Sequence, residues 1–257
     1  SQSTGNFIKR PGIAGGTTGD NYTGNTYLNK LHKLSIKNCD GPIYVRNFFV
    51  DAETLYDTAI EVVNSNVVLE NCAAVRAKES GFKFENSTVM LSRSAAAYRN
   101  YEILTATTRK AKIGFGFHAI NSDISVSSDP TTVISTNSVG DTGASGSDCF
   151  VIASRNYAGF VLENSKFSGG VQRVVATQPL DGGIIASELN TGYGVILNNS
   201  QMNTKGLLDL YGDDVAIEAT GSNLTFEQLC IDCHSSEAIK AFDSTITFDS
   251  PTSPTEA

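Results

Sequence analysis

The sequence predicts an all-β protein that folds as a right-handed, single-stranded parallel β-helix, a solenoid of about eight coils. Three observations predict it. Apolar residues recur two apart, an Asn-Ser-like pair interrupts each apolar run, and the shortest interval between copies is 22 residues. A coil of about 22 residues accommodates three short strands and three turns. One coil cannot bury its own apolar face, so stacked coils are needed to make a continuous core.

The clearest copy of the repeat reads Gly-Phe-Lys-Phe-Glu-Asn-Ser-Thr-Val-Met-Leu at residues 81–91. Alternate apolar residues on both sides of the Asn-Ser pair share one face of a strand. Asn86 tolerates a left-handed backbone, which permits a sharp bend between two strands. Gly81, like the small residue that begins each other copy, is expected to form a corner.

The serine of each pair marks the copies along the chain, after a degenerate first copy at residues 34–38. The intervals between serines are 22, 35, 43, 35, 22 and 22 residues, so insertion loops are predicted in three consecutive central coils. Insertions in a solenoid commonly lie on one face, which is often the binding face. The right hand follows from the general preference of parallel crossover connections. The marking serines are Ser65, Ser87, Ser122, Ser165, Ser200, Ser222 and Ser244.

The repeat divides the chain into three parts. Residues 31–249 are predicted to form the β-helix, residues 1–30 an extended arm or cap, and residues 250–257 a linker or tail. Open ends of a β-helix expose strand edges that promote aggregation, so a cap or partner is expected at both ends. The polar start shows no signal peptide, which predicts a chain that is mature, excised from a longer protein, or exported by lysis or assembly.

Charge and composition exclude several classes of partner. The net charge is −8 and no run of Lys and Arg forms a basic stripe, so no nucleic acid is expected as a partner. No segment reaches the roughly 18 apolar residues of a membrane span. The five cysteines are irregularly spaced, which argues against a disulfide framework. Cys230, Cys233 and His234 supply only half of a zinc site, so buried thiols are favoured and neither metal nor cofactor is predicted.

An Arg-Asn-aromatic triplet occurs three times and supplies the candidate binding residues. Arginine can clamp a carboxylate or sulfate with two hydrogen bonds, and tyrosine can stack on a sugar ring. The pairing suits an acidic glycan, whereas the alternative is exposed turns whose aromatic rings pack locally. The candidate binding residues are Arg46, Arg99, Tyr101, Arg155 and Tyr157.

Two kinds of polysaccharide cleavage supply the candidate catalytic residues. Glycoside hydrolysis needs two carboxylates about 5 to 10 Å apart, and Asp213-Asp214 with Asp181 of a neighbouring coil offers such acids. A lyase needs a base near neutral pH, and His118 is predicted to point outward from its strand beside the central insertions. Acids at solvated turns and a lone surface histidine are the alternative interpretation of all four residues.

The repeat resembles the pectate-lyase-like superfamily of right-handed parallel β-helices over residues 31–249. Asn86-Ser87, Asn164-Ser165 and Asn199-Ser200 are similar to that superfamily's turn between the first two strands. The superfamily includes polysaccharide lyases, glycosidases, adhesins and bacteriophage tailspikes. The Asn-Thr-Asp and Gly-His-Gly motifs of polygalacturonases are absent, which disfavours that activity.

The resemblance implies a structural and receptor- or glycan-binding module of a phage tail fibre or spike. Such a module would be extracellular or on the virion surface, would bind a polysaccharide or cell-surface glycan, and would form a homotrimer. Two alternatives stay open: a polysaccharide lyase or glycoside hydrolase acting on an acidic polysaccharide, and a secreted adhesin. Fold resemblance alone does not choose among them.

Overall fold

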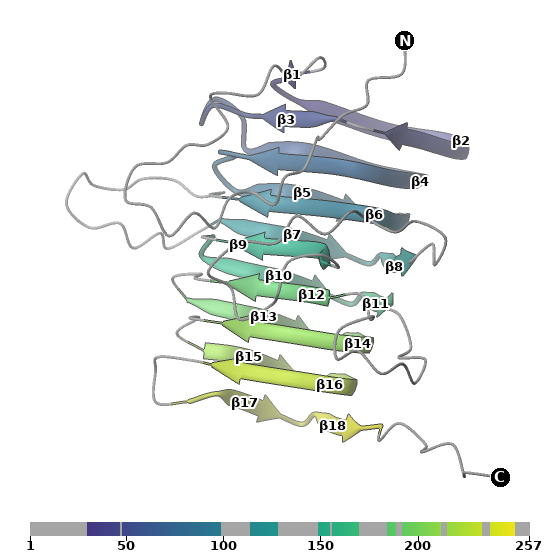
Figure 1. The fold of residues 1–257 in the computed structure, drawn as a ribbon. Coiled ribbons are helices and arrows are strands. Elements are labelled where there is room, and N and C mark those ends of the chain that lie inside the picture. The colour runs from purple at the N-terminus through teal and green to yellow at the C-terminus, as the bar shows by residue number, and fades with distance from the viewer. Residues whose placement is uncertain are drawn as a thin grey trace, which may run out of the picture.

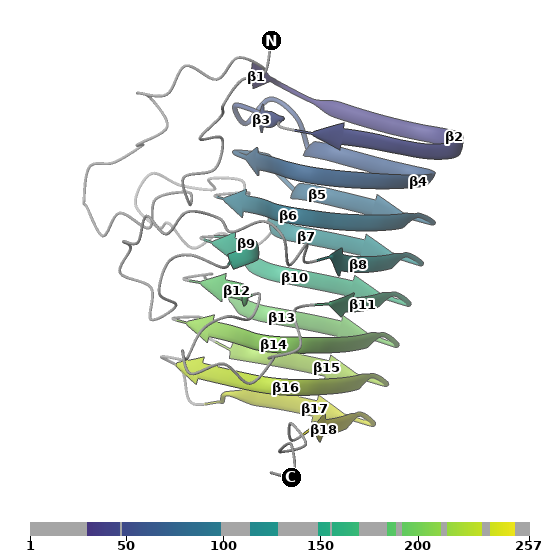
Figure 2. The same ribbon diagram turned by 45° about the vertical axis from the view of Figure 1, so that its right-hand side comes forward.

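The computed structural model confirms an all-β, right-handed parallel β-helix, whose coils descend from β1 (Lys30–Leu31) to β18 (Thr245–Phe248) in Figures 1 and 2. Every strand pairing in it is parallel. The structure describes residues 30–46, 48–98, 114–127, 149–154, 156–169, 184–188, 192–211, 215–232 and 237–249. This part of the chain contains no helix, and so none that could span a membrane.

Three parallel ladders of strands run down the solenoid. The first contains the starts of β2 (Leu34–Arg46) and β4 (Thr58–Val75), then β5 (Ser80–Glu85), β7 (Phe115–Ile120), β10 (Ala158–Glu163), β13 (Tyr193–Asn198), β15 (Val215–Thr220) and β17 (Ile239–Phe242). The second contains later parts of β2 and β4, then β6 (Thr88–Tyr98), β8 (Asp123–Ser127), β11 (Lys166–Gly169), β14 (Gln201–Tyr211), β16 (Asn223–Asp232) and β18. The third contains β1, β3 (Phe49–Asp51), the ends of β4, β6, β14 and β16, β9 (Cys149–Ser154) and β12 (Ile184–Glu188).

The corner between the first and second ladders is the Asn-Ser-like pair. The residue before each corner serine has a positive φ, from 47° at Asn64 to 59° at Gly221. Only glycine and short polar residues such as Asn and Asp adopt this conformation readily, which explains the sequence pattern. The eight corner residues are Asn38, Asn64, Asn86, Asn121, Asn164, Asn199, Gly221 and Asp243.

The corner serines form a continuous hydrogen-bonded ladder. Each backbone N–H from Ser65 to Ser222 donates to the hydroxyl of the next coil's serine, at 3.0 to 3.2 Å. Each hydroxyl from Ser65 to Ser244 donates in turn to the carbonyl two residues earlier in its own coil. Cys39 holds the first position, and its N–H donates to Ser65 Oγ. The ladder provides hydrogen-bond acceptors for backbone N–H groups that are buried at the tight bend.

The apolar core is a column of side chains stacked coil upon coil. Phe82 and Phe117 stack with ring centroids 4.6 Å apart, and Phe117 and Phe160 with centroids 5.1 Å apart. All three rings are nearly fully buried. The alignment of these residues in successive layers, predicted from the repeat, is confirmed by their strand register.

In six of the seven copies, from Ala59 to Ala216, the small residue that begins the copy lies within a strand and does not form the expected corner. Gly116 lies within β7, and a Cβ there would come within 2.6 Å of Gly159 O and 2.8 Å of Ala153 Cβ. The residue at this position must be small because strands of the first and third ladders approach each other closely there, inside the coil. The constraint is therefore close packing of a strand and not a turn conformation.

The three predicted insertions leave the solenoid at two different corners. Residues 99–113 connect the third ladder to the first, between β6 and β7. Residues 128–148 and 170–183 instead follow β8 and β11 of the second ladder, in adjacent coils. The insertions themselves lie outside the described residues.

Candidate functional site

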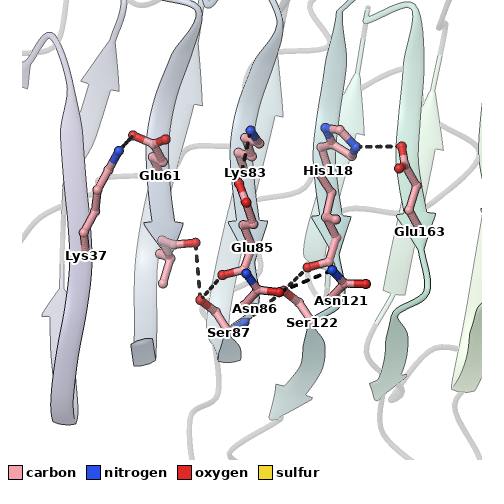
Figure 3. Close-up of polar contacts among 12 residues, drawn as sticks. Lys37, Glu61, Lys83, Glu85, Asn86, Ser87, His118, Asn121, Ser122 and Glu163 are labelled. Atoms are coloured by element: carbon pink, nitrogen blue, oxygen red, sulfur yellow. Dashed lines mark hydrogen bonds and ion pairs between the residues drawn. The ribbon is translucent and has the colours of Figure 1, made fainter. Parts of the chain in front are cut away.

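The outer face of the first ladder carries a histidine and a carboxylate in hydrogen-bonding contact. His118 Nε2 lies 3.0 Å from Glu163 Oε1, and Figure 3 shows the two side chains pointing toward each other from β7 and β10. His118 occupies an outward position on its strand, as predicted from its place between Phe117 and Ala119. The Phe115 ring packs edge-on against the imidazole, with centroids 4.9 Å apart.

The environment of His118 favours a neutral imidazole. Burial lowers its pKa, and this effect outweighs the hydrogen bond and the charge of Glu163, which act in the opposite direction. Lys83, its register partner on β5, lowers the pKa further. A neutral imidazole in contact with a carboxylate is the arrangement that a general base requires.

A row of asparagine amides lies at the end of the same strands. Asn86, Asn121 and Asn164 are exposed corner residues in three successive coils, while the serine after each is buried. Asn121 Nδ2 donates to Asn86 Oδ1 at 3.3 Å (Figure 3). The serine hydroxyls hydrogen-bond within the internal ladder, so the amides are the corner groups exposed to solvent.

An open, shallow groove of about 440 Å³ follows this row of corners across the three coils. Three exposed residues at the starts of the second-ladder strands, Thr88, Asp123 and Lys166, form the rest of its outer lining with the three amides. They are register partners, Thr88 opposite Asp123 and Asp123 opposite Lys166. The same position in each coil thus contributes one amide and one further polar side chain.

Two of the predicted binding residues lie in the described part of the chain, and both are engaged in contacts within the protein. Arg46 Nε lies 2.6 Å from Glu70 Oε2, where the glutamate side chain is only 11% exposed. The Tyr157 ring packs edge-on against Tyr193, with centroids 5.8 Å apart, and a Cβ on Gly192 would come within 2.7 Å of it. Arg46 lies on β2 and Tyr157 just before β10, so the two do not meet in one site.

The remaining sequence-predicted residues lie outside the described residues. His118 is the only weak catalytic candidate that the structure describes, and its register partner on β10 is Val161. Tyr157 precedes Val161 by four residues, which is about 13 Å along a strand. The candidates outside the described residues are Arg99, Tyr101, Arg155, Asp181, Asp213 and Asp214.

Sequence reasoning missed the partner of His118 and the groove. Glu163 contacts His118 only because the chain returns to the next coil 45 residues later. The Asn-Ser pattern by itself predicts only a turn at these asparagines. The signal that identifies the groove was present in the sequence, since a turn residue that recurs once per coil must form a row on the surface.

The described residues contain no group of three or more His, Cys, Asp or Glu side chains that could hold a metal ion. Cys39 and Cys72 are free thiols there. Compared with known proteins, the chain matches no family model, no curated protein and no solved structure. The resemblance to the pectate-lyase-like superfamily therefore stays a prediction, while the β-helical fold stands on the structure itself.

Proposed function

We propose that the chain is a structural and glycan-binding module of an extracellular or virion surface, such as a segment of a phage tail fibre or spike. The groove along the asparagine corners is the observation that carries the proposal. It offers amide, hydroxyl, carboxylate and ammonium groups, which together donate to and accept from sugar hydroxyls.

The rigidity of the solenoid supports this role. The serine ladder and the stacked phenylalanines fix the corner backbone from coil to coil, so the groove exists before a ligand arrives. A preformed site loses less conformational entropy on binding. The homotrimer expected from the resemblance stays a prediction, and sedimentation of the purified chain would test it.

The test is a glycan screen followed by titration of variants in the groove. Asn121→Gly removes an amide while keeping the left-handed corner, since Gly221 occupies the same position in another coil with φ of 59°. Loss of the amide should weaken binding of a glycan found in the screen about fivefold or more. Asn199→Gly is the matched control, because Asn199 has the same conformation at φ of 47° but lies outside the groove.

Equal effects of the two substitutions would show that the groove is not the binding site. Absence of binding to any acidic or neutral glycan would remove the proposal. Thermal unfolding of both variants establishes that any loss of affinity is not a loss of folding.

The His118–Glu163 contact favours polysaccharide cleavage as a second candidate function. In this alternative, His118 takes a proton as general base and Glu163 holds the imidazole in place. Incubation with acidic and neutral polysaccharides, with assay of new reducing or unsaturated ends, tests it. Product formation that is lost in His118→Gln but kept in Asn199→Gly would support an enzyme, whereas binding without product supports the module.

A further inference from the structure

We infer that the groove takes an uncharged polysaccharide bearing acetamido groups, with the sugar chain running parallel to the solenoid axis. The inference rests on the proposed function and names its ligand class. Three features of the groove carry it: its charge balance, the hydrogen-bonding atoms of its amides, and its direction across the coils.

The charge of the groove does not suit an acidic glycan. Asp123 and Lys166 are the only charged residues in its lining, and they sit opposite each other in register on neighbouring strands. One negative and one positive charge sum to zero at neutral pH. A uronic acid polymer would place one carboxylate per sugar along this row. Repulsion of its carboxylates by Asp123 would offset their attraction to Lys166, so the groove has no net attraction for an acidic glycan.

The amides have the polarity of an acetamido group. Asn121 Nδ2 donates to Asn86 Oδ1, so the Nδ2 donors of Asn86 and the Oδ1 acceptor of Asn121 take no part in this contact. No other side-chain partner of these two atoms occurs among the described residues. An acetamido group carries one N–H donor, which suits the Asn121 Oδ1 acceptor, and one C=O acceptor, which suits the Asn86 Nδ2 donors. The acetamido groups of a polysaccharide can therefore pair with both asparagine atoms.

The direction of the groove follows from the repeat. Its lining comes from equivalent positions in three successive coils, which are separated by about 4.8 Å, the spacing of neighbouring strands. A ligand that uses all three amides must therefore cross the strands along the axis. A linear polymer meets this requirement because it presents similar groups at regular intervals. The groove is open to solvent along its length, so an internal segment of the polymer can bind without a chain end.

The test uses three β-1,4-linked hexamers that differ only at C2, carrying acetamido, ammonium or hydroxyl groups: those of N-acetylglucosamine, glucosamine and glucose. A hexamer of galacturonic acid supplies the acidic comparison. Titration of the full chain should show the N-acetylated hexamer binding at least about fivefold more tightly than the other three. Its affinity should be nearly the same at low and high salt, because no net charge is exchanged.

Groove variants connect the ligand preference to named atoms. Asn86→Gly and Asn121→Gly should reduce the preference for the acetamido hexamer over the glucose hexamer, whereas Asn199→Gly, outside the groove, should leave it unchanged. Thermal unfolding of each variant checks that folding is retained.

The outcomes separate this inference from the proposed function. Equal or tighter binding of the glucose, glucosamine or galacturonate hexamer at the groove overturns the inference and leaves a glycan-binding module standing. The same holds if none of the four hexamers binds but a glycan without acetamido groups does so in an Asn121-dependent way. Absence of binding to every glycan overturns both.

Discussion

The hydroxyl of Ser122 accepts a hydrogen bond from the backbone N–H of Ser87 in the coil before it, at 3.1 Å, and donates to the carbonyl of Ile120 at 2.8 Å. One side chain therefore satisfies two backbone groups, one in each of two coils. Because the contact recurs from coil to coil, the corner that displays the asparagine amides is held by side chains buried just beneath it.

Ser122→Ala should destabilise the protein by about 1–3 kcal/mol, since it leaves the buried Ser87 N–H without its acceptor. Urea unfolding measures the change. The matched control is Ser125→Ala on β8, which begins directly after Ser122. The Ser125 side chain is half-buried and faces outward, so its loss should cost about 0.5 kcal/mol or less. Equal destabilisation by the two substitutions would contradict the ladder.

Phe117→Ala should cost about 3–5 kcal/mol because it removes the middle ring of the stack and leaves a cavity between Phe82 and Phe160. Phe242, which is 60% exposed on the last coil, provides the comparison, and Phe242→Ala should change stability by about 0.5 kcal/mol. Similar midpoints for the two variants in chemical unfolding would mean that the column is not the core.

Thr204→Val should stabilise the protein by about 1 kcal/mol. Thr204 Oγ1 is buried and has no hydrogen-bond partner among the described residues, and valine fills nearly the same volume without a hydroxyl. A rise in the unfolding midpoint at unchanged m-value would confirm the expectation. A fall would show that the hydroxyl has a partner whose loss is costly.

Protonation of His118 should destabilise the folded chain in mildly acidic solution. Burial lowers the folded-state pKa of His118 below the ordinary value of 6.5, so the unfolded state binds more protons as pH falls through that value. The stabilising contribution is complete above about pH 7 and is lost progressively as pH falls below the ordinary value of 6.5. Thermal unfolding of the native chain should decline more steeply over this range than that of His118→Gln, and parallel profiles would refute the expectation.

Cys72 should resist alkylation in the native protein. Its side chain is fully buried, and burial raises the pKa of its thiol to about 12, so the reactive thiolate is scarce at neutral pH. Cys230 is exposed and should react readily. Peptide mass spectrometry after brief alkylation distinguishes the two sites, and labelling of Cys72 in folded protein would place it outside the core.

The sequence was sufficient to predict the coil, because a parallel β-helix repeats its physical requirements once per turn. Phe82, Phe117 and Phe160 align since each precedes an Asn-Ser bend by the same number of residues. The Gly116 position was misinterpreted because glycine serves both turns and close packing, and only the distance to Gly159 O separates the two uses.

The candidate site was less accessible to sequence reasoning. The contact between His118 and Glu163 depends on which residue of the next coil lies diagonally across the ladder, and insertions of unequal length hide that relation in the linear sequence. The sequence predicts that Arg46 faces a ligand, but its guanidinium group instead pairs with the carboxylate of Glu70 in the adjacent coil. Contacts with the adjacent coil determine whether a charged side chain is used within the fold or stays available to a ligand.

A crystal structure of the chain with a bound oligosaccharide tests the central claim most directly. The account predicts sugar rings laid along the solenoid axis, across the corners at Asn86, Asn121 and Asn164, with hydrogen bonds to their amides. A glycan bound elsewhere, such as on the outer face at His118 or beside Tyr157, with the asparagine corners bare, would contradict it.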